Sequence, residues 1–491
     1  MKIGIDFGTS FSLPAGLIDG RPATLLPSGE YGIPSVFYYD SEVGVQVGAA
    51  AEDNADFQPN NIKRNIKMEI SSGAGSFHAD GKTFSTSQIC GYIFREVAHV
   101  AEEECKRREL IDQKITGAVV SVPAAFNLRE LNVIRNAAQL SKENGGAGLR
   151  VLRFIREPVA AAISYFNAPN AEDEKTILVY DLGGGTCDVA IVRSDHNSDE
   201  WYCVLESEMA RIGGRDWDQV LVDLVKRKYQ AHYGLMTFDT EAESKIYKQS
   251  IRAKHTLSSQ PSARVSVVIN GRSHSCVITA EEFENATESI LNRTMDLAKS
   301  LIQKCHTNVD YIVCVGGSSN MPQVRKAFER RYPTIPVKLY DPSNAIAFGA
   351  AIYAKHLDEE HYLRDICKFS YGGEYVQDFE KYHDWNRLRI WNLIYKGSRL
   401  PSSGSSTSVK LEDGSSGTYI ALYESECTDD IYLPEKGVCI GSIRITGLTD
   451  SRAGDKTVLT MTIDQSGLMQ VEAVDMRTEK KAFAEIQLKD F

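Results

Sequence analysis

The sequence has 491 residues, which is typical of about three domains. Hydrophobic residues make up 42% and charged residues 25%, as in an ordinary globular protein with a buried core. The formal charge of −11, from 55 basic and 66 acidic side chains, argues against nucleic acid or an anionic membrane as the main partner.

Three further features favour a cytoplasmic protein. No apolar run approaches the roughly 18 residues of a membrane span. The N-terminal stretch MKIGIDFG enters a strand pattern directly, so no signal peptide is expected. The cysteines are scattered without a CxxC pair, which favours reduced thiols over a disulfide frame or a zinc site.

Strand-like runs alternate with long helical patterns up to about residue 354. The predicted strands are residues 2–6, 116–123, 176–181 and 311–317. Apolar residues recur at helical spacing in residues 130–142, 217–229, 286–303 and 323–332. This alternation predicts an α/β architecture with at least partly parallel sheets.

Helical periodicity fades beyond about residue 365. Short alternating runs follow at residues 389–395, 418–424, 440–448, 458–463, 468–474 and 482–488. Clusters such as SSGSS, LEDGSSG and DQSG separate them and resemble turns. The pattern predicts an all-β sandwich. A disordered linker is the alternative for the Ser/Gly clusters.

The stretch YDLGGGTCDV, residues 180–189, places three consecutive glycines between two apolar runs. Glycine lets backbone N–H groups close on a ligand, and successive N–H groups form a concave anion site. Asp181 and Asp188 would repel a bare phosphate, so they favour a divalent cation at the same place. A β-hairpin with a glycine-rich turn and no ligand is the alternative.

A second stretch, IGIDFGTS at residues 3–10, repeats the pattern of apolar strand, aspartate, glycine and hydroxyl. Such a repeat predicts two similar half-domains that face each other and hold one polyphosphate from opposite sides. Neither stretch is a Walker-type loop, because no GxxxxGK[ST] occurs.

A third glycine site is VCVGGSSNMP, residues 313–322. Gly316 and Gly317 follow a predicted strand, and Pro322 suits a helix start. A glycine pair here lets a flat ligand ring lie against the backbone. A tight strand–helix turn without a ligand is the alternative.

These stretches together resemble the 70-kilodalton heat-shock chaperones. GIDFGTS, VVSVPAAFN, REPVAAAISY, YDLGGGTCDVAIV, IGGRDWD, RAKHTLSS and VGGSSNMP occur in the family's order and close to its spacing. The resemblance implies an α/β actin-like two-lobed ATPase domain, internally duplicated, at residues 1–355. A linker at 356–368 and an all-β sandwich that binds substrate at 369–491 would follow, without the family's helical lid.

The resemblance also implies how ATP or ADP would bind with Mg²⁺. Asp6 and Asp181 would hold the metal through waters. The phosphates would lie between two sets of loop residues: Gly8, Thr9 and Ser10 on one lobe, and Gly183, Gly184, Gly185 and Thr186 on the other. Five residues would line the nucleoside: Gly316, Gly317, Ser318, Lys254 and Ser258.

Two charged residues complete the implied catalytic set with Asp6, Asp181 and Thr186. Lys63 is matched to the family lysine that reaches the γ-phosphate and the attacking water. Alternatively, Lys63 is one charge in a solvated run with neighbouring basic residues. Glu157 would position the water or relay the nucleotide state; alternatively, it is an acid at a helix N-terminus.

Several positions depart from the family pattern. Asn320 stands where an arginine stacks on adenine, and Ile251 and His255 replace a glutamate and an arginine of the adenosine helix. Weaker nucleotide affinity or looser base preference is expected. Arg215 replaces an acid and Leu131 a relay arginine. The linker offers only Tyr362 and Leu363 before Arg364, so weaker coupling between nucleotide and peptide is expected.

The sandwich is expected to bind an extended peptide through main-chain groups and a side-chain pocket near Ile390, Thr418 and Ile420. Thr418 is polar where the family is apolar, so this pocket is expected to be shallow. Without a lid, exchange should be fast and affinity modest. Ordinary sandwich core is the alternative for these three residues.

Three functions fit these features. The first is an ATP-hydrolysing, lidless chaperone relative that binds unfolded or extended polypeptide, with a co-chaperone or exchange factor as a further partner. The second is a nucleotide-gated interaction module with little turnover, which binds one dedicated partner. The third is another actin-type protein, a sugar kinase or a filament former, against which the β-sandwich argues.

Overall fold

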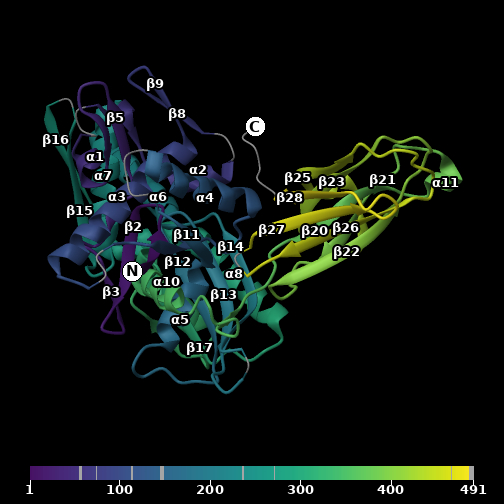
Figure 1. The fold of residues 1–491 in the computed structure, drawn as a ribbon. Helices are drawn as coiled ribbons and strands as arrows, with labels where there is room; N and C mark the ends of the chain where they lie inside the picture. Colours follow the sequence, from purple (N-terminus) through teal and green to yellow (C-terminus); the bar gives the residue numbers. More distant parts are fainter. Residues whose placement is uncertain are drawn as a thin grey trace.

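Two six-stranded sheets lie at the centre of residues 1–364, here called the N-terminal portion, in the computed structural model (Figure 1). The structure describes residues 1–54, 58–72, 75–111, 114–143, 149–198, 200–234, 237–269, 271–465 and 467–485. Among these residues, no helix is long and apolar enough to cross a membrane.

The two sheets share one topology. The first has the order β11-β10-β1-β2-β3, spanning Val151–Arg156, Gly117–Val122, Lys2–Phe7, Phe11–Ile18 and Arg21–Thr24, with β4 (Ile33–Pro34) on β2. The second has the order β18-β17-β12-β13-β14-β19, spanning Val337–Leu339, Tyr311–Val315, Thr176–Leu182, Cys187–Ser194, Tyr202–Ala210 and Leu363–Arg364. In each sheet, two neighbouring parallel strand pairs adjoin two antiparallel pairs, and in the second sheet β19 adds a further parallel pair with β14. This similarity is the pattern that an internal duplication would produce.

The central strands form where the sequence predicts them. The four runs expected as strands are confirmed as β1, β10, β12 and β17. β10 and β12 are buried along their whole length, as strands of a sheet covered on both faces are. The mixed α/β architecture expected for this part of the chain is therefore present.

Two helices, α5 (Glu157–Phe166) and α10 (Ala345–Lys355), pack tightly at the centre of the N-terminal portion. A Cβ on Gly349 would lie 1.7 Å from the carbonyl oxygen of Ala160, so only glycine permits this approach of α10 to α5. A Cβ on Gly4 would lie 2.2 Å from the amide nitrogen of Ala351, so α10 also lies directly on β1.

Further helices and small sheets surround these elements. The helices are α1 (Ala49–Asn54), α2 (Ile66–Ser72), α3 (Thr86–Arg107), α4 (Leu128–Glu143), α6 (Gly214–Tyr233), α7 (Thr240–Leu257), α8 (Ala280–Cys305) and α9 (Pro322–Arg331). The small sheets contain β5 (Phe37–Asp40), β6 (Gly44–Val47), β7 (Ile62–Lys63), β8 (Ser76–Ala79), β9 (Lys82–Ser85), β15 (Ser262–Ile269) and β16 (Arg272–Thr279). The four predicted helices are confirmed within α4, α6, α8 and α9.

Residues 370–485 form a β-sandwich with a shared apolar core. One sheet has the order β24-β21-β20-β23-β25, spanning Ile431–Tyr432, Leu388–Ile394, Ser370–Val376, Gly417–Ser425 and Val438–Thr446. The other has the order β22-β26-β27-β28, spanning Ser402–Val409, Lys456–Ile463, Met469–Asp475 and Lys481–Glu485. A short helix, α11 (Phe379–Tyr382), lies between β20 and β21 at the end far from the N-terminal portion (Figure 1).

One expected turn is a strand. The SSGSS cluster lies in β22, which pairs with β26 along its whole length. Its side chains alternate between the two faces of the sheet, as in any strand. The expected strand at residues 482–488 is β28 up to Glu485, and its last three residues lie outside the described residues.

The sandwich lies beside the N-terminal portion (Figure 1). β19, within the expected linker, pairs in parallel with β14. The Arg156 guanidinium donates to Asp365 at 2.7 Å, and the Lys368 ammonium donates to Glu208 at 2.8 Å. Leu128, at the start of α4, packs within the apolar core of the sandwich. Charged and apolar contacts therefore both join the two parts.

Candidate functional site

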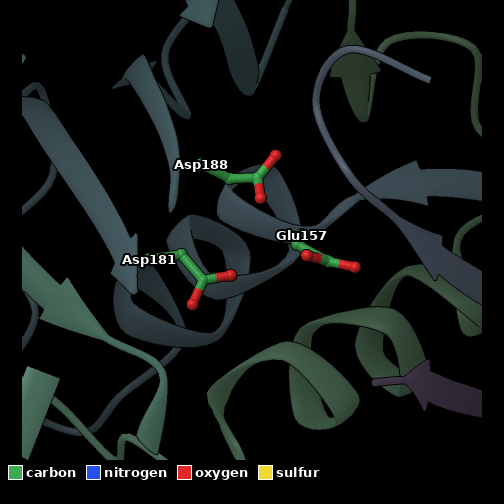
Figure 2. A group of neighbouring side chains, drawn as sticks. All are labelled: Glu157, Asp181 and Asp188. Atoms are coloured by element: carbon green, nitrogen blue, oxygen red, sulfur yellow. The ribbon is translucent and has the colours of Figure 1, made fainter. Parts of the chain in front are cut away.

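Four carboxylates gather where the two six-stranded sheets meet. Asp6 lies near the end of β1, Asp181 near the end of β12, Asp188 in β13, and Glu157 begins α5. Oxygens of Glu157, Asp181 and Asp188 lie within 4.8 Å of one another, and Figure 2 shows these three side chains as neighbours. Each of the three is at most 5% exposed. Such a concentration of buried negative charge requires a compensating cation.

Lys67 on α2 is the cation in this cluster. Its ammonium forms a buried ion pair with Glu157 and lies 5.9 Å from the centre of the Phe7 ring. Burial opposes the charge of Lys67, but Glu157 and Asp6 outweigh it and raise the pKa of the lysine. Lys67 therefore stays positively charged, with several carboxylates around it.

Lys63, which the resemblance matches to the catalytic lysine, makes its described contacts outside this cluster. Lys63 ends β7, pairs with Glu69 and lies 5.6 Å from the centre of the Phe77 ring. After β7 the chain turns at Asn65, whose φ is +58°, a conformation that asparagine adopts more readily than most residues. This turn starts α2 and places Lys67, four residues after Lys63, among the carboxylates.

The three aspartates of the cluster, Asp6, Asp181 and Asp188, resist ionisation in this surrounding. Burial, followed by the charge of Glu157, raises the pKa of Asp6 to about 6 and that of Asp188 to about 7. The same two causes raise the pKa of Asp181 well above its usual value. A bound cation would reverse these shifts, because it favours the charged form of each group.

Two buried oxygens of the cluster lack a hydrogen-bond partner among the described residues: Oδ1 of Asp181 and Oδ2 of Asp188. The other groups are engaged, since Ser121 donates to Asp6 at 2.9 Å and the Ala124 amide donates to Asp188 Oδ1 at 2.6 Å. Unpartnered buried carboxylate oxygens are unusual and suit a hard cation such as Mg²⁺. The residues present therefore fit the metal that the sequence led us to expect.

The two predicted glycine hairpins face each other beside the carboxylates. A Cβ on Gly184 would lie 2.7 Å from the Ser10 hydroxyl, and one on Gly185 would lie 3.1 Å from the Thr9 hydroxyl. The turn itself closes with a hydrogen bond from the Gly183 amide to the Thr186 carbonyl at 3.0 Å. Residues 8–10 and 183–186 are thus brought together from the two six-stranded sheets.

A further glycine pair, Gly213 and Gly214 of the motif IGGRDWD, joins the site, although the sequence assigned it no role. The Gly214 amide donates to the Gly183 carbonyl at 2.9 Å, and a Cβ on Gly213 would lie 2.5 Å from the Gly185 amide nitrogen. The signal in the sequence is a glycine pair that opens the amphipathic helix α6. The positive end of that helix points at the hairpin 183–186.

The residues expected to line the nucleoside are connected to one another by hydrogen bonds, an ion pair and close backbone contacts. Ser318 donates to the Gly183 carbonyl at 3.0 Å, and a Cβ on Gly316 would lie 2.3 Å from Asp181 Oδ1. Lys254 pairs with Asp218 at 2.7 Å, and the Ser258 hydroxyl donates to the Lys254 carbonyl at 3.1 Å. These contacts join the third glycine site and α7 to the hairpin.

Two positions that depart from the family pattern lie on the same side. The Asn320 amide donates back to the Gly317 carbonyl at 3.0 Å, so its side chain is engaged locally. Burial and the charge of Lys254 lower the pKa of His255, which favours its neutral form. Neither residue supplies the planar cation that stacks on a base.

The three expected peptide-pocket residues do not share one surface. Gly372 and Gly373 are consecutive in β20 and therefore face opposite sides of the sheet. A Cβ on Gly372 would meet Ile390 at 3.0 Å, whereas one on Gly373 would meet Ile420 at 3.3 Å. Ile390 is therefore separated from Ile420 by the sheet. Thr418 lies with Ile420 on the inner side, where its hydroxyl lies 3.4 Å from that of Thr457.

The comparison with known families agrees with this geometry. The glycine hairpins, the buried lysine–carboxylate cluster and the adjoining β-sandwich lie in one chain. A family model described as Hsp70 protein matches residues 71–490, which is more than half of the sequence, and the chain therefore belongs to the Hsp70 family.

Proposed function

We propose that this chain binds ATP or ADP with Mg²⁺ between its two glycine hairpins, hydrolyses ATP slowly, and couples the nucleotide state to the binding of extended polypeptide. Members of the Hsp70 family are ATP-dependent chaperones, so the general activity follows from membership. One observation carries the specific assignment. Lys67 is buried among four carboxylates, two of whose oxygens lack partners among the described residues, beside closely packed glycine loops.

In this proposal the acidic cluster holds the metal. Asp6 and Asp181 are the candidate ligands, directly or through water, and the free Oδ1 of Asp181 supports the assignment. When bound, Mg²⁺ would supply charge neutralisation for the phosphates. The amides of residues 8–10 and 183–186 bind the phosphate oxygens, and the Thr186 hydroxyl adds a donor.

Lys67 takes the role first expected for Lys63. Its ammonium neutralises charge at the reacting phosphate, since phosphoryl transfer depends mainly on positioning and electrostatic stabilisation. Glu157, held by Lys67, orients the attacking water and accepts a hydrogen bond from it. Both residues are at most 5% exposed, so bulk water does not weaken these interactions.

A nucleotide-gated interaction module with little turnover is the second candidate. It is favoured by the absence of the relay arginine, whose place Leu131 takes, and by the neutral side chains of Asn320 and His255. Leu131 lies 3.6 Å from the Cβ position of Gly467 in the sandwich and thus contributes an apolar contact in place of a charged one. In both candidates the sandwich binds polypeptide through main-chain groups, with Ile390, Thr418 and Ile420 as the candidate side-chain contacts.

Single-turnover hydrolysis of Mg²⁺–ATP separates the two candidates. Lys67→Ala should lower the rate at least about 100-fold, as removal of a transition-state cation does. The matched variant Lys63→Ala should change it less than about threefold, because Lys63 lies outside the cluster. Equal rates for wild type and Lys67→Ala would contradict hydrolysis at this site. Calorimetric binding of Mg²⁺–ATP without turnover would support the second candidate.

A further inference from the structure

Glu424 is a buried carboxylate at the junction between the sandwich and the N-terminal portion. It lies in β23, and its carboxylate accepts a hydrogen bond from the backbone amide of Leu128, the first residue of α4. Glu424 is 6% exposed, and its Oε2 atom has no partner among the described residues. Leu128 itself packs in the sandwich core, so this contact lies at the centre of the junction.

Few groups around Glu424 compensate its charge. Its charged and titratable neighbours lie on three elements: Tyr371 on β20, Tyr432 on β24, and Glu130 on α4. Glu130 carries the same sign of charge and pairs with Arg211 at 3.2 Å. Glu424 has no ion pair within the described part of the chain. Two acidic groups, Glu424 and Glu130, thus meet across the junction, and Arg211 pairs with Glu130 rather than with Glu424.

We propose that Glu424 makes docking of the sandwich on the N-terminal portion dependent on protonation: the sandwich is held when the Glu424 carboxyl is neutral and is released more readily when it ionises. Docking buries the carboxyl against α4 and opposite Glu130, and undocking returns it to water. An ionised carboxylate loses more hydration on burial than a neutral one. The neutral carboxyl also has a proton to donate from the oxygen that is now unpartnered.

The direction of the effect follows from the surroundings of Glu424 in the docked state. Burial raises the pKa of Glu424 to about 7; bonds from Tyr371 and the Leu128 amide oppose this shift, and the charge of Glu130 adds to it. The N-terminus of α4 also favours the ionised form, but burial outweighs it. A pKa that is higher in the docked state means that docking is favoured at low pH. This contribution is lost as the pH rises through about 7.

This pH dependence of docking does not rest on the proposed function, because docking can be measured on the full chain without nucleotide. It would make the arrangement of the two parts respond to pH across the physiological range. The ionic contact between Lys368 and Glu208 at the junction would not supply the same response, since the pKa of Glu208 is lowered by Lys368 despite burial.

The test is small-angle X-ray scattering of the full chain between pH 5.5 and 8.5 at constant salt, which reports the docked fraction. Wild type should lose docking over this range, with the docking constant falling about tenfold for each pH unit of difference between docked and undocked pKa. Glu424→Gln, an uncharged isostere, should stay docked at every pH. Glu426→Gln is the matched control, because the Glu426 side chain is 74% exposed, and it should follow wild type.

A second variant keeps the test informative if Glu424→Gln folds poorly. Glu130→Gln removes the like charge and should move the wild-type midpoint to higher pH. Docking of wild type that does not change with pH would overturn the proposal. An unchanged pH profile in Glu424→Gln would do the same, because the titrating group would then lie elsewhere.

Discussion

Two buried lysines, one in each part of the molecule, have opposite surroundings. Lys410 in the sandwich pairs with Asp475 at 2.7 Å, and Thr478 donates its amide and hydroxyl to the same carboxylate at 2.9 and 2.8 Å. Lys67 instead faces an excess of carboxylates, some with unpartnered oxygens. One site is complete within the chain, whereas the other lacks positive charge that a ligand can supply.

The pKa values express the same difference. Burial opposes ionisation of Asp475, but Lys410 and Thr478 outweigh it and lower the pKa to about 2. In the cluster around Lys67, burial prevails and the pKa values of Asp6 and Asp188 rise. A buried ion pair whose polar atoms all have partners within the chain therefore points to a structural role. A buried cluster with unpartnered carboxylate oxygens points to a binding site.

The largest effect on stability is expected from Asp475→Asn. The change leaves the Lys410 ammonium buried, with only Asp455 nearby at 3.9 Å. Removing one partner of a buried pair lowers the free energy of unfolding by about 4 kcal/mol. Urea unfolding of the full chain, followed by circular dichroism, measures the loss.

Glu472→Gln is the control for this change. Glu472 lies in the same strand, β27, and its ion pair with Lys481 is solvent-accessible, with side chains 33% and 54% exposed. Such pairs contribute about 0.5 kcal/mol or less. A loss in Asp475→Asn no larger than that in Glu472→Gln would show that the buried pair is not a major structural contact.

The next largest effect concerns the metal at Asp181. Mg²⁺–ATP at 100 times its dissociation constant should raise the free energy of unfolding of wild type by about 2.7 kcal/mol. Asp181→Asn should lose most of this gain, while its stability without ligand is unchanged or higher, because a neutral amide replaces a carboxylate that resists ionisation. Differential scanning fluorimetry with Mg²⁺–ATP, ATP plus chelator, and buffer separates the two effects. Full Mg²⁺-dependent stabilisation of the variant would exclude Asp181 as a ligand.

A smaller effect is expected on the pH dependence of stability. The raised pKa of Asp188 means that its contribution is present below pH 3.8 and is lost as the pH rises through about 7. Asp188→Asn should therefore stabilise the ligand-free protein more at pH 8 than at pH 5, by a difference on the order of 1 kcal/mol. Urea unfolding midpoints at both pH values measure this.

Asp475 should show the opposite dependence. Its lowered pKa means that its contribution is present above pH 3.8 and is lost as the pH falls through about 2. If Asp188→Asn destabilised the ligand-free protein equally at pH 5 and pH 8, the cluster would be complete without a ligand, and the contrast between the two lysines would disappear.

Apolar runs and glycine stretches were sufficient to predict the central strands and the loops beside Asp6 and Asp181. They were not sufficient to predict which lysine, Lys63 or Lys67, lies among the carboxylates. Lys63 and Lys67 lie in the same polar run, and only the turn at Asn65 decides which one enters the cluster. Asparagine is a weak signal for this conformation, because it adopts a positive φ more readily than most residues but does not require one.

The side of the sheet on which Ile390 lies was also not evident from the sequence. Ile394 lies in the sandwich core, and simple alternation would place Ile390 on the same face. The register between β20 and β21 shifts between Tyr371 and Gly372, and such a bulge moves the following residues to the other face. Alternation in a single sequence does not reveal a bulge, because the extra residue need not be glycine.

The smallest expected effect is the loss of one hydrogen bond within the sandwich. Thr418 and Thr457 share a contact of 3.4 Å between hydroxyls, and Thr457 is 1% exposed. Thr418→Val should lower the free energy of unfolding by about 0.5 kcal/mol, since it leaves the Thr457 hydroxyl buried without this partner. The double variant Thr418→Val with Thr457→Val should recover most of the loss, because both polar groups are then absent. If the two losses simply added, the hydroxyls would not be partners, and the inner side of the sandwich at Thr418 would be open to water and to a polypeptide.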